Sequence, residues 1–304
     1  MQTTKPTHLA LIGFGYWGKK CFSTINSIPN VTIHYLVTSQ THLNLDSSIT
    51  ILTHWTQLLT SSNVDGVIIA APSNMHYEIA KAFIKQNIPV FIEKPMTLST
   101  TQATELVTLA KQYQSKVLVD HILLYSPAFQ AMKTFVKQHK QPIKRIHMIS
   151  GKWTPYPEHV SVLWEWAPHE IAMCFDLFNH DIQTHSVSTT QRNFKSTYGQ
   201  TIDFTGSVNT IPLTISWSNL RKRPVRQVVI TYDDKQLIFD DKVDNKLAIL
   251  DKDNCKTLLT YPNNLALTVA FETFALMINQ PTIDYHDVNL GAKVVSFIEH
   301  LSKR

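Results

Sequence analysis

Three glycines at a fixed spacing follow the first apolar segment of the chain. His8–Ile12 is typical of a strand, and Tyr16–Ile28 has the apolar period of a helix. Between and within them stand Gly13, Gly15 and Gly18. In a strand–turn–helix context the first glycine permits a tight turn, the second lets the backbone approach a phosphate, and the third lets helix and strand pack closely. The turn predicts a nucleotide pyrophosphate at a helix N-terminus, and the alternative is a tight structural turn.

The first 120 residues alternate short apolar runs with amphipathic stretches, the pattern of parallel strands joined by helices. We expect further strands at residues 32–37, 66–70 and 90–92, and further helices at residues 75–86 and 101–114. This half is therefore predicted to be a Rossmann sheet.

Beyond Lys144 the pattern changes, because apolar runs follow one another with few helices between them. The runs are residues 144–150, 213–217, 227–232 and 236–240, and two helical patterns at 265–279 and 286–301 close the chain. We expect a mostly antiparallel open sheet here, so the fold class is α/β with two domains, residues 1–121 and 122–304.

Composition excludes several other classes of protein. With 43% apolar and 17% charged residues over 304 positions, the chain can bury a substantial core. Cys21, Cys174 and Cys255 show no metal-binding or disulfide spacing, so we expect no metal site. No apolar run has the length of a signal peptide or a membrane span. A cytoplasmic protein with no membrane partner is the simplest interpretation.

Basic residues are concentrated in one stretch, Arg221–Arg226. The formal net charge of +5 is otherwise spread out, and no second cluster accompanies this one. A solvated loop is therefore favoured over a nucleic-acid contact, and we expect no nucleic-acid partner.

The end of the second expected strand bears on which dinucleotide is preferred. An acidic residue here would bind the adenosine ribose, but the chain has Thr38 and Ser39 instead. Their hydroxyls could donate to a 2′-phosphate, while no Arg or Lys is present to hold one. NAD(P) with a slight lean to NADP is predicted, and the alternative is that these residues simply begin a loop.

Four segments in this order resemble the Gfo/Idh/MocA oxidoreductase family. They are GFGYWG at 13–18, AAPSNMHYEIAKAFIKQNIPVFIEKP at 70–95, LWEWAPHEIAMCFDL at 163–177 and SWSNLRKRPVRQVVITYDDKQLIFDD at 216–241. The resemblance covers nearly the whole chain, and the EKP tripeptide is its most specific element. It implies a dinucleotide-binding domain followed by a domain for substrate binding and oligomerisation, acting with NAD or NADP on a sugar or related polyol.

Three catalytic residues follow from this resemblance. Lys94 stands on the EKP lysine, which is expected to touch the substrate hydroxyl and the nicotinamide ribose. His169 stands on the histidine of the family pattern D-x-x-x-H. Histidine suits proton exchange with a hydroxyl near neutral pH. His169 is expected at the start of a helix, Ala167–Phe178. Glu165 replaces the family's aspartate, and its extra methylene moves the carboxylate.

Binding residues are predicted in two groups. The cofactor group comprises Gly13, Phe14, Gly15, Tyr16, Trp17, Gly18, Thr38, Ser39, Ala71, Pro72, Ser73, Asn74, His76, Glu93 and Lys94, with a structural role also open for Glu93. The substrate group comprises His121, Tyr125, Trp153, Trp166, Lys94 and His169, although core packing explains the tryptophans equally well.

The function predicted from these residues is hydride transfer between nicotinamide and a secondary alcohol or ketone of a sugar, a sugar nucleotide or a cyclic polyol. The alternative is a non-catalytic regulator of the same fold, which Glu165 and the missing ribose acid keep open. A homodimer or homotetramer is expected because an open sheet needs its outer face covered.

Overall fold

The computed structural model describes residues 6–61, 63–156 and 161–303. The chain forms two compact units. The first comprises Met1–Ile122 with Leu265–Glu299, and the second Leu123–Asn264 with His300–Arg304.

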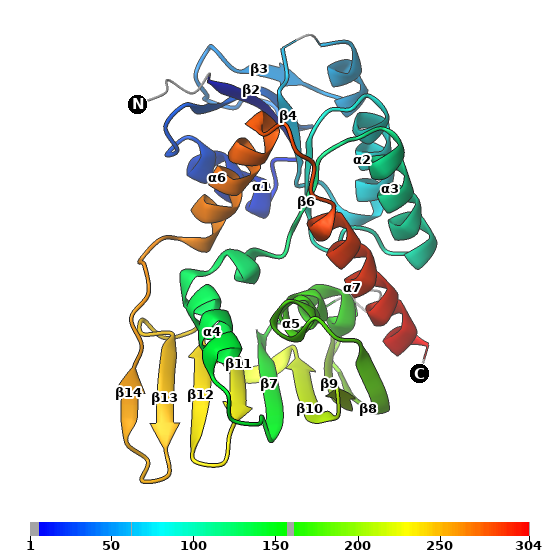
Figure 1. The fold of residues 1–304 in the computed structure, drawn as a ribbon. Helices are drawn as coiled ribbons and strands as arrows, with labels where there is room; N and C mark the ends of the chain where they lie inside the picture. Colours follow the sequence, from blue (N-terminus) through cyan, green and yellow to red (C-terminus); the bar gives the residue numbers. More distant parts are fainter. Residues whose placement is uncertain (1–5, 62, 157–160, 304) are drawn as a thin grey trace. The chain divides into compact units, whose positions relative to one another are not determined.

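The first unit is built on a parallel sheet, as predicted, and this sheet has six strands (Figure 1). Its strand order is β3-β2-β1-β4-β5-β6, the doubly wound order of a Rossmann domain. Its strands are β1 (Thr7–Ile12), β2 (Val31–Val37), β3 (Thr50–Leu52), β4 (Gly66–Ile69), β5 (Val90–Glu93) and β6 (Val117–Asp120). Their connections contain α1 (Tyr16–Ile25), η1 (Trp55–Thr60), η2 (Ser73–Met75), α2 (His76–Lys85) and α3 (Thr100–Gln112). Helices on both faces explain why β4, β5 and β6 are buried throughout.

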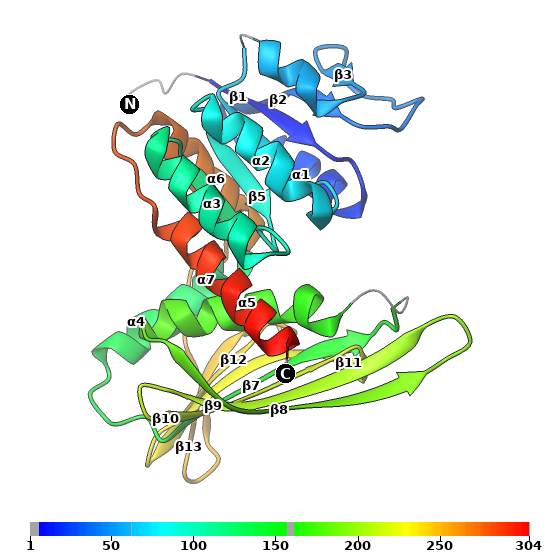
Figure 2. The ribbon, with the colours of Figure 1, turned by 90° about the vertical axis from the view of Figure 1, so that its right-hand side faces the viewer.

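Two C-terminal helices, α6 (Ala266–Asn279) and α7 (His286–Ser302), pack mainly with this first unit. Phe271 and Phe274 of α6 lie 4.8 and 5.6 Å from the ring of Phe91 in β5. On α7, a Cβ at Gly291 would lie 2.8 Å from Val119 of β6. Figure 2 shows α7 close to α3. Both helices were predicted within the domain of residues 122–304, and they lie mainly in the first unit because their apolar faces cover the parallel sheet.

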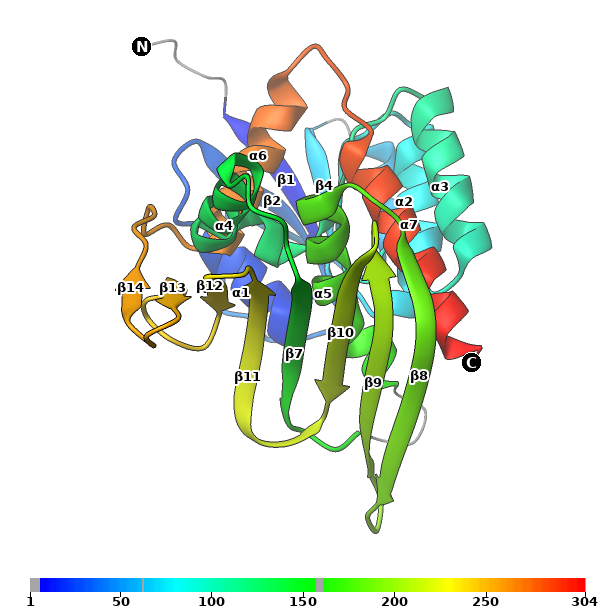
Figure 3. The same cartoon turned by 60° about the horizontal axis from the view of Figure 1, so that its bottom comes forward.

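The second unit contains an eight-stranded sheet of order β14-β13-β12-β11-β7-β10-β9-β8 (Figure 3). Its strands are β7 (Arg145–Trp153), β8 (Ile182–Asn193), β9 (Tyr198–Val208), β10 (Ile211–Ser218), β11 (Leu220–Thr231), β12 (Lys235–Asp240), β13 (Leu247–Asp251) and β14 (Lys256–Leu258). All neighbours pair antiparallel except β10 with β7, which confirms the mostly antiparallel sheet. The helical segments before and beside this sheet are η3 (Ile122–Tyr125), α4 (Pro127–Gln138) and α5 (Val162–Phe178).

The two faces of this second sheet differ in chemistry. The inner face carries buried apolar side chains such as Met148, Ile215 and Trp217. On the outer face, polar side chains pair across strands: His147 with Thr214, Ser186 with Thr205, and Ser216 with Asp203. Polar groups of the outer face therefore satisfy one another, and this face is not a continuous apolar surface.

Two predictions about secondary structure are wrong. The basic stretch Arg221–Arg226, predicted as a loop, lies in β11, where the register with β7 shifts between Leu220 and Val225. The helix predicted from Ala167 begins at Val162, because Pro168 lies inside the helix and does not open it. Among the described residues no helix is both long and apolar enough to cross a membrane.

Candidate cofactor cavity and catalytic residues

The glycine turn lies at the carboxyl end of β1, between β2 and β4, where the strand order reverses. Gly13 has a φ of 99°, and a Cβ there would lie 2.5 Å from the carbonyl oxygen of Ala70. A Cβ at Gly18 would lie 2.1 Å from the carbonyl oxygen of Gly13. Around Gly15, by contrast, no heavy atom lies within 4 Å of such a Cβ. Gly13 and Gly18 are therefore needed by the fold itself, whereas Gly15 borders open space.

That open space meets the start of α1. Gly15 is the N-cap of the helix, and no side chain caps its first backbone N–H groups. The first N–H groups of a helix have no partner within the helix, and with the helix dipole they favour an anion. The turn therefore fits a pyrophosphate, as the glycine spacing predicts.

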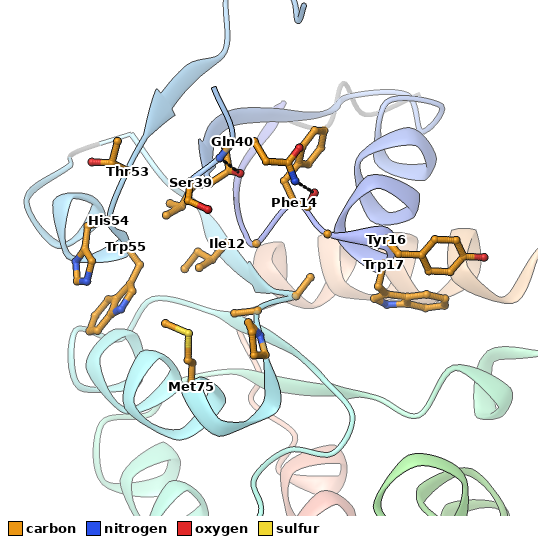
Figure 4. Close-up of a pocket in the computed structure, with 17 residues that line it drawn as sticks. Ile12, Phe14, Tyr16, Trp17, Ser39, Gln40, Thr53, His54, Trp55 and Met75 are labelled. Atoms are coloured by element: carbon orange, nitrogen blue, oxygen red, sulfur yellow. Dashed lines mark hydrogen bonds between the residues drawn. The ribbon is translucent and has the colours of Figure 1, made fainter. Parts of the chain in front are cut away.

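A cavity of about 500 Å³ extends from this turn (Figure 4). It is lined by Ile12, Gly13, Phe14, Gly15, Tyr16, Trp17, Val37, Thr38, Ser39, Gln40, Thr53, His54, Trp55, Ala70, Ala71, Pro72 and Met75. No Asp, Glu, Lys or Arg is among these residues. The cavity is thus mostly apolar with a few hydroxyl and amide groups, as is usual for a cofactor site.

Many of the residues predicted to bind the cofactor line this cavity. They are Gly13, Phe14, Gly15, Tyr16, Trp17, Thr38, Ser39, Ala71 and Pro72. Gly18, Ser73, Asn74, His76, Glu93 and Lys94 are not among its lining residues. Eight lining residues were not predicted: Ile12, Val37, Gln40, Thr53, His54, Trp55, Ala70 and Met75. No Gly, Pro, Asn or Asp marks the turn at residues 53–55, so no local signal in the sequence pointed to these three residues.

Hydroxyl and amide groups form the cavity wall after β2. Thr38 accepts a hydrogen bond from the backbone N–H of Gln40 at 3.1 Å, and the Gln40 side chain donates to the carbonyl of Phe14 at 2.7 Å. This second bond ties the end of β2 to the glycine turn. Ser39 is exposed beside them. The wall therefore offers hydroxyl groups to a ribose or its phosphate and no charge of either sign.

His54, Trp55 and Met75 lie at the end of the cavity away from Tyr16 (Figure 4). His54 caps η1, and its ring stacks on Trp55 with centroids 5.6 Å apart. Trp55 also contacts the buried ring of Phe83, 6.2 Å away, which restricts its orientation. This end follows β3, next to β2, so it lies on the side where a Rossmann domain holds adenosine.

We expect Trp55→Ala to weaken NAD and NADP binding by about 5- to 150-fold, because stacking of a base on an aromatic ring contributes about 1–3 kcal/mol. Trp55→Phe keeps a ring and should retain most of the affinity. Calorimetry with NADH, NADPH and reduced nicotinamide mononucleotide checks this. Equal losses for the mononucleotide, which has no adenine, would show that Trp55 acts only through the fold.

Lys94 follows β5 directly, and the peptide bond to Pro95 is cis. Lys94 is half-buried, whereas Glu93 before it is buried and pairs in register with Asp120 of β6. Burial raises the pKa of Glu93, and the Asp120 carboxyl raises it further. Burial likewise raises the pKa of Asp120 to about 6. The two carboxyls therefore resist carrying two negative charges beside Lys94.

His121 comes next along the chain and is only 2% exposed. Burial lowers its pKa to about 3, and the positive charge of Lys94 contributes to this. His121 is therefore neutral at physiological pH. Its predicted contact with substrate stays a prediction.

In the second unit, His169 lies in the third turn of α5 and not at its start. Glu165 lies one turn earlier on the same helical face. Its side chain is exposed, whereas His169 is only 7% exposed. Asp176, further along α5, bonds Lys133 at 2.6 Å and so has a structural role.

Buried polar contacts hold this part of α5 on the sheet. Glu170 accepts hydrogen bonds from Trp217 at 3.0 Å and from Arg226 at 3.1 Å. The Arg226 guanidinium also lies 5.2 Å from the ring of Trp166, whose indole N–H donates to Tyr156 at 2.8 Å. Charge-assisted bonds of this kind position the backbone next to His169.

The remaining residues predicted to bind substrate lie in different settings of the second unit. Trp166 is 8% exposed and packs in the interior. Trp153 is 52% exposed at the end of β7 and meets Phe194 edge-on. Tyr125 is half-buried at the end of η3. Of the two tryptophans, Trp153 is the more accessible to a ligand.

Comparison with known proteins identifies the first unit. Residues 7–121 match the family of oxidoreductases with an NAD-binding Rossmann fold, Gfo/Idh/MocA. A crystal structure of a candidate oxidoreductase from Magnetospirillum magnetotacticum MS-1 is 28% identical with a TM-score of 0.89, and covers 97% of this chain and 99% of that one.

Two other relatives are similar over shorter aligned sequences. An uncharacterized oxidoreductase of Synechocystis is 38% identical over 82 residues, 27% of this chain and 22% of that protein. The UDP-N-acetylglucosamine 3-dehydrogenase of Acidithiobacillus ferrooxidans is 31% identical over 72 residues, 24% of this chain and 23% of that protein. Its crystal structure has a TM-score of 0.78 at 18% identity, covering 97% of this chain and 96% of its own, and so shows the shared fold. The chain thus spans less than a quarter of the length of each of these two curated relatives in sequence alignment. The matching family model, the glycine turn and the six-stranded sheet together identify residues 7–121 as the NAD-binding Rossmann domain of the Gfo/Idh/MocA oxidoreductase family.

Proposed function

We propose that this oxidoreductase transfers a hydride between a nicotinamide dinucleotide and a secondary alcohol or ketone of a sugar, a sugar nucleotide or a cyclic polyol. The observation that carries the proposal is the placement of Glu165 and His169 one turn apart on α5, a helix held by buried polar contacts. An acid–base pair is what alcohol oxidation requires, because the hydroxyl proton must leave as the hydride does. The relative from Acidithiobacillus ferrooxidans, by its name a dehydrogenase of a sugar nucleotide, supports the substrate class.

Each residue has a stated role in this proposal. The bound dinucleotide supplies the hydride donor or acceptor at its nicotinamide. His169 takes the hydroxyl proton or returns it, since histidine changes charge near neutral pH. Lys94 donates a hydrogen bond to the substrate oxygen and favours its negative charge. Glu165 orients the imidazole or the substrate.

For the cofactor, we propose binding along the cavity that begins at Gly13, with NADP favoured over NAD at most modestly. The wall formed by Thr38, Ser39 and Gln40 has no carboxylate to repel a 2′-phosphate, and no cation to attract one. Hydrogen bonds from hydroxyl groups alone contribute less to the affinity for a 2′-phosphate than a contact with Arg or Lys would.

The experiment is a panel assay that follows nicotinamide oxidation or reduction. UDP- and TDP-linked sugars and their keto forms are compared with free inositols and free sugars, each with NAD(H) and NADP(H). Turnover of a member of these classes that saturates with concentration supports the proposal. Binding of the dinucleotide with no turnover of any of them would reject it.

The comparisons do not favour a non-catalytic regulator. That alternative depended on Glu165 and on the missing ribose acid, and Lys94 and His169 are both retained in the sequence. We also propose a homodimer or homotetramer. Its interface on the open sheet would be polar, because the outer-face side chains are largely polar. Light scattering that gives the 34.7 kDa monomer mass at micromolar concentration would contradict this assembly.

A further inference from the structure

His76 is a buried histidine whose two ring nitrogens face two different segments of the first unit. It is 1% exposed and begins α2. Nδ1 lies 2.9 Å from the carbonyl oxygen of Pro95, and Nε2 lies 2.9 Å from the carbonyl oxygen of Ala71. Both oxygens can only accept, so each contact is a hydrogen bond when that nitrogen carries a proton. The imidazole therefore lies between two main-chain carbonyls and contacts one with each ring nitrogen.

The two segments that it bridges have separate roles in the proposed function. Ala71 lines the cofactor cavity and follows β4. Pro95 follows Lys94 at the end of β5. Backbone hydrogen bonds link β4 to β5 along the strands as far as Ile69 and Ile92. Beyond those residues, His76 is a side-chain link between the cavity wall and the Lys94 turn.

His76 itself is poorly suited to contact a ligand. Its ring is buried, it is not among the residues that line the cavity, and both nitrogens are directed at carbonyls. Burial lowers its pKa, the two carbonyl contacts oppose this, and Lys94 lowers it further. With both nitrogens protonated the ring donates to both carbonyls, and with one N–H it donates to one carbonyl and packs against the other. A group in this position can act on the reaction only through the segments it holds.

We propose that His76 is a positioning residue, which holds the Ala71 wall of the cofactor cavity and the Lys94–Pro95 turn at one separation. This inference rests on the proposed function, because it assigns Lys94 to the substrate oxygen and the cavity to the dinucleotide. A rigid ring suits the task, since it has only two rotatable bonds and is packed on all sides. Catalysis is sensitive to such placement, and a shift of about 1 Å can cost about 10²-fold in rate.

The test compares His76→Gln with Tyr77→Phe. Glutamine retains a donor, but its one amide nitrogen cannot reach both carbonyls. Tyr77, the next residue of α2, is 9% exposed and donates to Glu105 at 2.5 Å, away from Ala71 and Pro95. The same hydroxyl accepts from Lys81 at 2.8 Å, so Tyr77→Phe removes two hydrogen bonds from the same buried helix and controls for general loss of stability.

Hydrogen–deuterium exchange is the first readout, because it needs no substrate. In His76→Gln the backbone amides of both segments, residues 70–75 and 96–98, should exchange faster than in the parent. The increase in exchange rate should exceed any increase in Tyr77→Phe by at least about threefold. A slowly exchanging His76 ring N–H should also be present in ¹⁵N spectra of the parent. Fast exchange of the ring N–H in the parent would overturn the bridge. So would amide exchange rates in both segments of His76→Gln that equal those of the parent.

Kinetics give the second readout. In His76→Gln, kcat should fall about 10- to 100-fold while the dissociation constant for NADPH changes less than about threefold. Tyr77→Phe should keep the kcat of the parent. Cofactor affinity that falls as much as kcat, or an equal kcat loss in both variants, would contradict a positioning role. A parent that binds dinucleotide but turns over no substrate would reject the proposed function, and the exchange data would still decide whether the bridge exists.

Discussion

His169→Ala is expected to lower kcat by about 10²–10⁴-fold while leaving NAD(P)H affinity close to that of the parent. A positioned acid–base group typically contributes this much to the rate, and His169 lies in the second unit, outside the cavity formed by the first. Single-turnover kinetics with the best substrate of the panel measure the loss, and calorimetry measures cofactor affinity. A decrease in cofactor affinity that matches the decrease in rate would contradict the assignment.

Glu165 provides a sharper test of the same pair. If it fills the role of an aspartate one turn before His169, Glu165→Asp should keep or improve kcat, whereas Glu165→Ala should lose roughly as much as His169→Ala. Asp176→Asn is the matched control on α5, because its carboxylate bonds Lys133 and is expected to affect thermal stability more than turnover. Full activity of Glu165→Ala would remove the basis for aligning this helix with the family pattern.

Lys94→Ala is expected to abolish most turnover, by about 10²–10³-fold, because removing a preorganised donor to a developing oxyanion typically costs this much. Cofactor affinity should change little, since Lys94 does not line the cavity. Lys94→Arg keeps the charge but alters its reach and geometry, so it should recover only part of the rate. Lys144→Ala removes an exposed lysine paired with Asp233 and should behave like the parent.

A shift in the pH–rate profile would strengthen this assignment. The neighbouring Glu93 and Asp120 carboxyls have raised pKa values, so their ionisation responds to the positive charge of Lys94. Removing that charge should raise the pKa values of the pair further. Lys94→Ala that retains parental kcat at every pH would show that this lysine takes no part in hydride transfer.

The parallel half of the fold could be predicted from sequence because its signals are local. Buried strands such as Gly66–Ile69 are continuous apolar runs, and each is followed by a helical period. In the second half, β8, β9, β13 and β14 were not predicted, and β8 shows one reason. Residues 182–193 are mostly polar and exposed, so the strand has little apolar alternation to detect. Pairing with neighbouring strands, which a single segment does not reveal, makes it a strand.

Tertiary packing also decided where α5 begins. A proline inside a helix removes one backbone bond and usually marks a helix start or break. Here Pro168 lies in the interior of a helix that is buried along most of its length, and Ser161 caps the first turn. Burial of Val162, Leu163 and Trp166 offsets the lost bond.

The candidate site could be predicted only where one segment carries the signal. The glycine turn and the EKP tripeptide are contiguous in sequence, and both were recognised. His54 and Trp55 belong to a different loop, and they reach the cavity only because β3 pairs with β2. The bridge made by His76 depends on two carbonyl groups, which no side-chain pattern encodes.

The return of the chain to its first unit has a consequence for synthesis. Residues 1–122 emerge from the ribosome first, but Phe91 remains without its partners Phe271 and Phe274 until the last forty or so residues follow. Contacts between such distant parts of a chain form late, and until then the apolar surface they cover can engage other chains. During synthesis the nascent cofactor-binding sheet therefore exposes apolar surface that a chaperone would protect.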